Sequence, residues 1–330
     1  MKFLSTFVLL FASALTMCAA VEEPIDSRYR PIAPDPLVGD WQSSEPASVV
    51  AQVFLDEHGD YQANLLRQFD AENNFVATLR GTKRDGRLRL KDAGWSATIE
   101  EAHFRGSKES ESFDLQRVTR PSPTLGAKPP AGAIVLFDGK SLNAWANKHG
   151  KQWLVEDGPA PWKIIDGNIL EVVPGTGGGI ITHQTFGDCH LHVEFRTLGA
   201  PSNSGVFIQT RYEVNINESY GNLDGSANGG LDNCTPKTVA PRVRATRAPL
   251  EWQTFDIDFC APRFAATGAK TSAARATVRL NGVKLYENQE LTRPTGAAGR
   301  LGEASSGPLM LQEHGMPVQF RNIWLQPAAP

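Results

Sequence analysis

Residues 206–217 alternate between apolar and polar side chains, and this period of two restricts the segment to a β-strand. The even positions, from Val206 to Ile216, are mostly apolar. Because successive side chains of a strand point to opposite faces, one face is suited to a core. The other face is predicted to carry hydrogen-bonding groups spaced roughly 6.6 Å apart, namely Gln209, Arg211, Glu213, Asn215 and Asn217. We interpret this row as a surface for sugar hydroxyls, with an ordinary solvated sheet face as the alternative.

The same period occurs in residues 191–196 and 252–260, where apolar side chains alternate with polar ones. In the first segment His190 and His192 share a face with Asp188, a pattern that could supply metal ligands. We prefer a solvated outer face for both histidines. Glu194 on the same face is interpreted as a member of a structural ion pair or as a site wall.

Residues 119–130 contain four prolines among twelve residues, so they can form neither a central strand nor a helix interior. We interpret them as a stiff, extended linker between two domains. Short alternating segments predict a small antiparallel barrel or sandwich over residues 37–118, with Asp85-Gly86 as a hairpin loop. Many strands and long loops over residues 131–330 predict a two-sheet jelly roll. The fold class is therefore all-β.

The first twenty residues predict a secretory signal peptide, since Lys2 precedes an apolar stretch that ends in small residues. Cleavage before Val21 would leave residues 21–36 as a flexible lead, and the protein would be exported to the periplasm or beyond. Cys18 as a lipidated residue is the minor alternative, because Met17 before it is not small. No other apolar stretch is long enough to cross a bilayer.

The formal net charge of −3 over 330 residues, without a basic run, argues against a nucleic-acid surface. Cys189, Cys234 and Cys260 would remain after cleavage, and the sequence does not choose among their three pairings. No Cys-x-x-Cys spacing indicates zinc. Residues 177–179 are three glycines without the Lys-Ser/Thr of a phosphate loop, so they are interpreted as a turn.

Glu213 and Glu218 have the spacing of the Glu-x-Asp-x-x-Glu strand of laminarinase-like glycosidases, with Asn215 in the middle position. Retaining hydrolysis needs two carboxyl groups on one face, roughly 5.5 Å apart. The two glutamates would meet this requirement only across a bulge. His314 is predicted at a strand end beside Gly315, where it could transfer protons or simply cap the strand.

Several short motifs follow one another in order along residues 131–330. They are Leu136-Phe137-Asp138-Gly139 with Trp145, Phe186-Gly187-Asp188, Glu194-Phe195-Arg196, Asn203-Ser204-Gly205-Val206, Arg211-Tyr212-Glu213-Val214, Asn281-Gly282, Gln312-Glu313-His314-Gly315 and Arg321-Asn322-Ile323. In this order they resemble a bacterial exported family, domain of unknown function 1080, also described as the 3-keto-disaccharide hydrolase or 3-keto-glucoside 1,2-lyase/hydratase family. Residues 37–118 resemble an accessory β domain sometimes attached to it.

The resemblance implies a concanavalin-like jelly roll and an enzyme that acts on a small 3-keto-glycoside without an organic cofactor. A ketone at C3 acidifies the proton at C2, the aglycone leaves from C1, and water adds to the unsaturated sugar. Such a site needs a base, a group that stabilises the enolate oxygen, and an acid for the leaving group. This chain departs from the family pattern at Asn215, Glu218 and Glu313, where the reach of the side chain changes by a methylene.

From this implied chemistry we predict His314 or Glu213 as the base and Arg211 as the oxyanion stabiliser. A divalent metal held by Glu213, Glu218 or Glu313 could assist. The side chains predicted to hold sugar hydroxyls are Asn203, Gln209, Asn215, Gln312 and Arg321.

Three other functions remain compatible with the sequence. A lectin-like module would bind sugars on the same polar face without turnover. A retaining glycosidase would use Glu213 and Glu218 on unoxidised glycosides. A structural protein of the cell surface would instead expose an aromatic patch without a polar cleft.

Overall fold

The computed structural model describes residues 30–44, 49–165, 167–222, 227–231, 234 and 239–328. The predicted signal peptide and most of the predicted lead lie outside these ranges. None of the described helices has the length and apolar character needed to cross a membrane.

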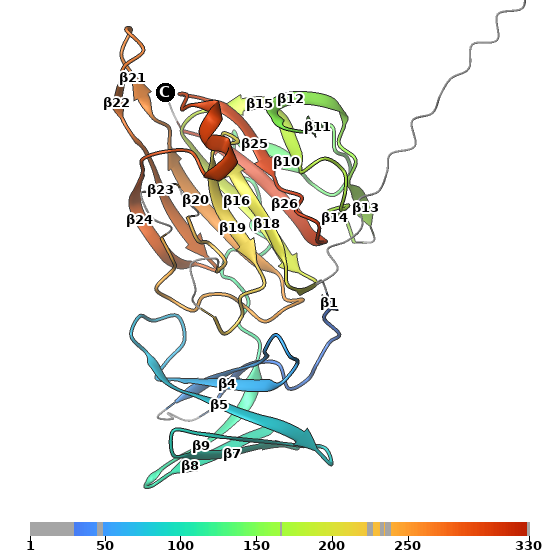
Figure 1. Ribbon diagram of the computed structural model, residues 1–330, viewed down its shortest axis with the longest axis vertical. Helices are drawn as coiled ribbons and strands as arrows, with labels where there is room; N and C mark the ends of the chain where they lie inside the picture. Colours follow the sequence, from blue (N-terminus) through green and yellow to red (C-terminus); the bar gives the residue numbers. More distant parts are fainter. Residues whose placement is uncertain are drawn as a thin grey trace, which may run out of the picture.

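The N-terminal domain is a closed antiparallel barrel, drawn in blue to green at the lower end of Figure 1. Asp85 and Gly86 form the predicted two-residue hairpin loop, with φ of 50° and 78° and Arg84 paired with Arg87. The sequence predicted either a barrel or a sandwich for this domain, and the structure is a barrel. Its strands are β2 (Gly39–Gln42), β3 (Val50–Leu55), β4 (Tyr61–Leu66), β5 (Phe75–Arg84), β6 (Arg87–Asp92), β7 (Trp95–Glu100), β8 (His103–Lys108) and β9 (Glu111–Val118).

The C-terminal domain is a sandwich of two antiparallel sheets, as the jelly-roll prediction requires. One sheet runs in the order β13-β14-β26-β16-β20-β23-β24, with β10 also on β26. Its strands are β10 (Ile134–Phe137), β13 (Lys163–Ile165), β14 (Ile169–Glu171), β16 (Cys189–Thr197), β20 (Gln253–Cys260), β23 (Ala274–Leu280), β24 (Val283–Leu291) and β26 (Val318–Pro327).

The second sheet runs in the order β12-β11-β15-β25-β18-β19. Its strands are β11 (Trp145–His149), β12 (Gln152–Pro159), β15 (Ile180–Phe186), β18 (Asn203–Ile208), β19 (Tyr212–Asn217) and β25 (Gly307–Leu311). The short elements are β1 (Arg30–Pro31), which pairs with β17 (Gly199–Ala200), the hairpin of β21 (Arg263–Phe264) and β22 (Lys270–Ser272), and the 3-10 helix η1 (Gly296–Leu301).

A single core fills the space between the two sheets. Phe195 of β16 stacks on Phe255 of β20 at 4.7 Å, and both are fully buried. Val206 and Leu311 of the second sheet close the core from the other side. Burial of each such side chain stabilises the fold by about 1.5–3 kcal/mol. The alternation of residues 191–196 and 252–260 therefore points its apolar side chains inward, as predicted.

The prediction of one continuous strand over residues 206–217 was wrong. Gln209 and Thr210 adopt left-handed conformations, with φ of 56° and 57°. The N–H of Arg211 donates to the carbonyl of Ile208 at 3.0 Å and closes a turn. The segment is thus a hairpin of β18 and β19, and its polar side chains do not form one row.

This turn depends on contacts with distant strands. The Gln209 amide donates to the carbonyl of Phe186 at 3.2 Å, and the Thr210 hydroxyl donates to the carbonyl of Pro308 at 2.8 Å. Because Gln-Thr is not a turn-forming pair, tertiary hydrogen bonds stabilise a conformation that the local sequence does not predict.

Glu218 follows β19 and faces away from Glu213. The hairpin register is regular through Asn217, so no bulge brings the two side chains to one face. The Glu218 carboxylate accepts hydrogen bonds from the Thr197 hydroxyl and from the N–H of Tyr220. Burial outweighs these hydrogen bonds and raises the pKa of Glu218 to about 7.

The proline-rich linker lies across the outer face of the larger sheet. Thr124 donates to Asp256 at 2.6 Å, and the N–H of Gly126 donates to Glu194 at 2.6 Å. His192 is consequently fully buried, paired with Asp256 at 2.7 Å and stacked on Trp324 at 4.9 Å. The expectation of a solvated face was therefore wrong for His192, because the linker covers it.

Glu194 is the central acceptor beneath the linker. Its carboxylate also receives hydrogen bonds from Arg321 at 2.7 Å and Asn322 at 2.8 Å. Burial would raise the pKa of Glu194, but His192 at 3.6 Å and the hydrogen bonds from Asn322, Gly126 and Arg321 outweigh it and lower the pKa to about 2. This is the structural ion pair that the sequence indicated.

A buried charge cluster joins the barrel to the sandwich. Asp40 of the barrel accepts from the Tyr220 hydroxyl at 2.6 Å and pairs with Arg120 of the linker at 2.8 Å. Arg120 also pairs with Asp70 at 2.7 Å, and Asp70 pairs with Arg247 of the sandwich at 3.2 Å. The cluster therefore connects both domains and the linker.

The described cysteines form no disulfide bonds. Cys189 and Cys234 are buried, whereas Cys260 is exposed. Burial raises the pKa of Cys189 to about 12, so this thiol is protonated at neutral pH.

We expect the Glu194→Gln substitution to lower the free energy of unfolding by about 3 kcal/mol at pH 7. The folded-state pKa of Glu194 is depressed, so its stabilisation is present above the ordinary value of 4.5 and is lost as pH falls toward 2. Urea unfolding of wild type and variant at pH 7 and pH 3 measures both effects.

Asp258→Asn is the matched control for this experiment. Asp258 lies on the same sheet face and pairs with His190 and Arg279, but its side chain is 50% exposed. Its replacement should therefore cost at most about 1 kcal/mol. Equal unfolding midpoints for the two variants would contradict the role given to Glu194.

Glu218→Gln should show the opposite dependence on pH. Because the folded-state pKa of Glu218 is raised, its stabilising contribution is complete below pH 4.5 and is lost as pH rises through about 7. The variant should therefore gain up to about 3 kcal/mol relative to wild type between pH 5 and pH 8. A difference in unfolding free energy that stays constant over this range would refute the assignment.

Candidate functional site

The outer face of the six-stranded sheet carries Glu213 and several of the other polar residues that the sequence singled out. Phe207 pairs with Glu213, and Gly205 pairs with Asn215, so these residues share one side of the hairpin. Phe207 also pairs with Met310 of β25, which extends the same side across the sheet. We call the outward polar residues of this sheet the polar face; they are Lys148, Asn203, Glu213, Asn215, Asn217 and Gln312.

Glycines leave the middle of the polar face without side chains. Gln312 donates its N–H to the carbonyl of Gly205 at 3.0 Å, and Lys148 donates its N–H to the carbonyl of Gly179 at 3.1 Å. A Cβ atom on Gly205 would lie 2.6 Å from Oε1 of Glu213. The absence of a side chain at Gly205 is therefore what lets the Glu213 carboxylate lie over the sheet.

An apolar cluster adjoins the polar face. It consists of Ala146, Ile181, Phe207 and Met310, with Trp153 packed on it. Trp153 meets Phe207 edge to face, with ring centroids 5.6 Å apart. An aromatic ring beside hydrogen-bonding groups is a suitable arrangement for a sugar, whose ring carries both C–H and O–H groups.

Lys148 is a buried cation of this face. Its ammonium group donates to the carbonyl of Gly150 and lies 5.4 Å from the Trp153 ring centroid. Burial lowers the pKa of Lys148, Glu313 opposes the shift, and Arg300 of η1 adds to it. The sequence did not single out Lys148. Its one indication was that Lys148 lies two residues after Ala146, so both side chains point to the same face of the strand that follows the Leu136-Phe137-Asp138-Gly139 motif.

Glu313 connects the closing motif to the three-glycine turn. Its carboxylate accepts from the N–H of Gly178 at 3.1 Å and from the N–H of Gly315 at 2.5 Å. The turn at residues 177–179 thus contributes to the site, although the sequence indicated only a loop. Spacing alone could not reveal this, because the two segments are far apart in the chain.

Arg211 and Gln209 lie at the turn rather than on the polar face. The Arg211 guanidinium donates to the carbonyls of Gly302 at 2.7 Å and Gln209 at 2.8 Å. Burial lowers the pKa of Arg211. Two of its donors thus bind backbone carbonyls, which is typical of a residue that holds a loop.

Two further candidates lie elsewhere. Arg321 belongs to the opposite sheet, where it binds Glu194 and stacks over the Trp252 ring at 4.1 Å. Glu218 faces away from Glu213 and binds Thr197, as described above. The core therefore separates Arg321 from the polar face.

His314 is exposed and follows Glu313, just beyond the end of β25. Asn203, Asn215 and Gln312 lie on the polar face as a group. The structure thus brings together Glu213 and three of the predicted hydroxyl-binding residues, with His314 beyond the end of the strand that carries Gln312.

The predicted metal ligands do not form one site. Within the described part of the chain, no group of three or more His, Cys, Asp and Glu side chains is placed to hold a metal ion. Glu218 and Glu313 bind separate backbone and hydroxyl donors. The set of Glu213, Glu218 and Glu313 therefore does not fit a divalent cation.

The polar face combines groups with distinct chemical abilities. Glu213 can act as a base, Lys148 can stabilise an anion, and the amides can bind hydroxyls. Glu213 is only 6% exposed and Lys148 only 3%. Their charges act on a ligand more strongly here than they would in bulk water, because nearby protein excludes solvent.

Comparison with known proteins agrees with the fold. The family model of the 3-keto-alpha-glucoside-1,2-lyase-like domain matches residues 132–326. A crystal structure from Parabacteroides distasonis, provisionally named a glycosyl hydrolase, is 33% identical, with a TM-score of 0.51 over 60% of this chain and 85% of that one. A second crystal structure from that organism, named likewise, is 19% identical, with a TM-score of 0.40 over 60% and 94%. No curated protein sequence matches.

The matched range covers the sandwich and excludes the barrel, in agreement with the resemblance found in the motifs. The family and the first of these structures support a carbohydrate-active hydrolase or lyase. The chain belongs to the family of 3-keto-alpha-glucoside-1,2-lyase-like domains.

Proposed function

We propose that the protein is an exported enzyme that cleaves 3-keto-glycosides by proton abstraction at C2, elimination and hydration. The observation that carries the proposal is the position of the Glu213 carboxylate over Gly205, on the same sheet face as Lys148 and Gln312. A base, a cation and hydroxyl-binding amides are the groups that this reaction needs.

Glu213 is assigned as the base. It removes the C2 proton, which the neighbouring C3 ketone makes acidic, and the electron pair moves onto the ketone oxygen as an enolate. Lys148 is assigned to stabilise that oxygen, because its buried ammonium group lies on the polar face. Arg211 was the sequence-based candidate for this role, but its donors bind two backbone carbonyls.

Departure of the aglycone completes the first half of the reaction. The enolate re-forms the ketone, a double bond forms between C1 and C2, and the C1–O bond breaks. His314 is assigned to protonate the leaving oxygen, because it is exposed beyond the end of β25, where an aglycone can depart. Water then adds to the double bond: its hydroxyl group bonds to C1, its proton goes to His314, and the proton held by Glu213 returns to C2. The net reaction is hydrolysis.

The binding of substrate hydroxyls is assigned to Asn203, Asn215 and Gln312. Within the described residues, Oε1 of Gln312 is buried and accepts no hydrogen bond. An acceptor of this kind costs free energy unless a ligand donates to it. The Trp153 ring beside the polar face would cover the apolar side of the sugar.

Export follows from the predicted signal peptide in residues 1–20, which would place the enzyme in the periplasm or outside the cell. The reaction as proposed runs through no metal ion, because the predicted carboxylate ligands do not converge. The small 3-keto-glycoside itself must come from an oxidation of the C3 hydroxyl by another enzyme.

Glu213→Gln is expected to reduce turnover of a 3-keto-glucoside by at least roughly 100-fold, since the substitution removes the base but keeps the shape of the side chain. His314→Ala should slow release of a poor leaving group more than that of a good one, because protonation matters less for the latter. Turnover numbers with alkyl and nitrophenyl 3-keto-glucosides measure both effects. Full activity in both variants would refute these assignments.

Glu218→Gln is the matched control in this assay. Glu218 faces away from the polar face, so its replacement should leave turnover within about twofold of wild type. A retaining glycosidase that used Glu213 and Glu218 would instead lose activity in both variants.

The unoxidised parent glucoside is expected to show no turnover, because its C2 proton lacks the acidifying ketone. Parallel incubations of the keto sugar and its parent, each with and without a chelator, give the comparison. Cleavage of the parent would favour the glycosidase, and binding without cleavage of either would favour a lectin-like module. Activity that a chelator abolishes and a divalent cation restores would contradict the metal-free scheme.

A further inference from the structure

The outer surface of the barrel contains a pocket of about 860 Å³ that crosses strands β5 to β9. The pairing register of strands β5 to β9 explains the shape of this pocket. Gly81, Leu90, Ala97, Gly106 and Phe113 are paired in one row across five strands. Leu90, Ala97 and Phe113 point into the barrel, and the glycines have no side chain, so little besides backbone forms the floor. We call this pocket the barrel groove.

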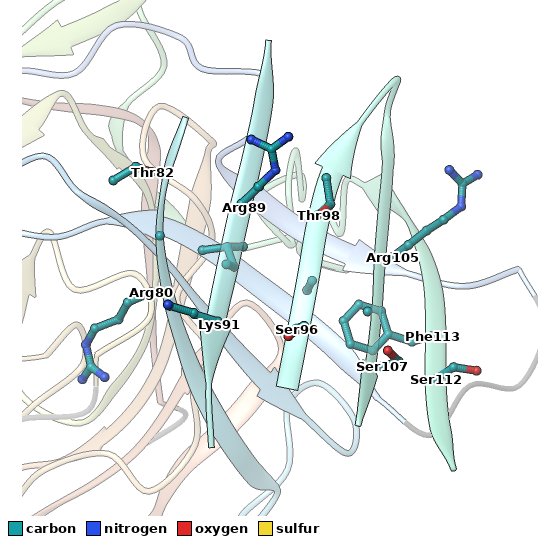
Figure 2. Close-up of a pocket in the computed structure, with 14 residues that line it drawn as sticks. Arg80, Thr82, Arg89, Lys91, Ser96, Thr98, Arg105, Ser107, Ser112 and Phe113 are labelled. Carbon is teal, nitrogen blue, oxygen red and sulfur yellow. The ribbon is translucent and has the colours of Figure 1, made fainter. Parts of the chain in front are cut away.

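Two outward-facing rows form the walls of the barrel groove. Figure 2 shows one wall along the upper part of the view and the other along the lower part. The upper wall consists of Thr82, Arg89, Thr98 and Arg105. The lower wall consists of Arg80, Lys91, Ser96, Ser107 and Ser112.

The groove is strongly positive in a chain whose formal net charge is −3. Arg80, Arg89, Lys91 and Arg105 line it, and no Asp or Glu does. Arg80 and Arg105 each bind an acidic neighbour outside the lining. Across the described ranges, neither Arg89 nor Lys91 forms an ion pair, so these two cations are available to a ligand.

Hydroxyl groups supply the rest of the polar lining. Threonines alternate with arginines along the upper wall, and three serines follow the two cations along the lower wall. The only aromatic residue of the lining, Phe113, is buried in the barrel. Single-stranded nucleic acids usually need exposed aromatic rings for their bases. A lining of cations and hydroxyls instead suits a ligand with anionic groups and many hydroxyls.

The groove also has the length and form for a chain rather than for a single small molecule. Five neighbouring strands span about 19 Å at their usual spacing. Cations occur on both walls, roughly 6.6 Å apart along a strand between Arg89 and Lys91. Anionic groups that project from both sides of an extended chain would therefore meet a cation on either wall.

We propose that the barrel groove binds an acidic polysaccharide whose sugars carry carboxylate groups. Guanidinium groups match carboxylates with paired hydrogen bonds, and Arg105 already binds the carboxylate of Asp114 at 2.9 Å. The choice of a carbohydrate rests on the proposed function of the sandwich. The barrel then holds the enzyme on a glycan while the polar face acts on a separate, small sugar.

The test measures binding of soluble polygalacturonate by the full-length protein, using calorimetry at low ionic strength. Arg89→Ser/Lys91→Ser should weaken binding by roughly tenfold or more, since it removes the two unpaired cations. Lys163→Ser/Lys284→Ser, which makes the same change in net charge on the exposed surface of the sandwich, should leave binding unchanged. Added salt should weaken wild-type binding, since the attraction is electrostatic.

Neutral dextran, dextran sulfate and a single-stranded oligonucleotide serve as competing probes. Equal affinity for dextran, tighter binding of the sulfated chain or the oligonucleotide, or no binding of polygalacturonate would overturn the proposal. Thermal unfolding confirms that each variant is folded, and Lys91→Ser alone replaces the double variant if that one is not.

The same preparations distinguish this proposal from the proposed function. Arg89→Ser/Lys91→Ser should turn over a small 3-keto-glucoside at the wild-type rate, because both residues lie on the barrel. Glu213→Gln should bind polygalacturonate like wild type. Binding without any turnover in wild type would refute only the catalytic assignment, and turnover without binding would refute only the barrel groove.

Discussion

The core between the two sheets of the sandwich is the constraint on which the rest of this structure depends. Each central strand must give every second side chain to that core, as Phe195 and Phe255 do from one sheet and Val206 from the other. The remaining side chains are thereby forced outward. Each sheet therefore has an outer face whose residues are free to differ from one sheet to the other.

One outer face is covered by the linker, whereas the other carries the polar face on which the proposed function rests. The proline-rich linker covers the larger sheet, where Glu194 receives its hydrogen bonds and His192 is buried. Since Arg120 of the linker also pairs with Asp40 in the barrel, the same segment fixes the two domains to each other. The six-stranded sheet keeps its outer face for Glu213 and its amide neighbours. The barrel groove is a separate polar surface. The barrel strands that form it lie at the lower end of Figure 1, below the sandwich.

Local alternation predicted much of this architecture. It placed β16 and β20 with their inward side chains. It gave no signal for β8, because Gly106 occupies an inward position where a Cβ would lie 2.4 Å from the Phe113 ring, so the strand lacks an apolar signature. It missed the turn at Gln209 because the partners of that turn belong to distant strands. It missed Lys148 because a lone lysine in a strand normally indicates solvent, whereas here the residue is buried.

The sequence by itself determined the all-β class, the order of the family motifs and the residue types available for chemistry. Those properties follow from side-chain parity, proline content and spacing, which are local. Only the tertiary structure decided which residues meet. It turned an apparent row into a hairpin, placed Glu213 over Gly205, sent Arg321 to the opposite sheet and assembled a cationic groove from five strands. Strand pairing joins residues that are distant in the chain, and no local pattern records that pairing.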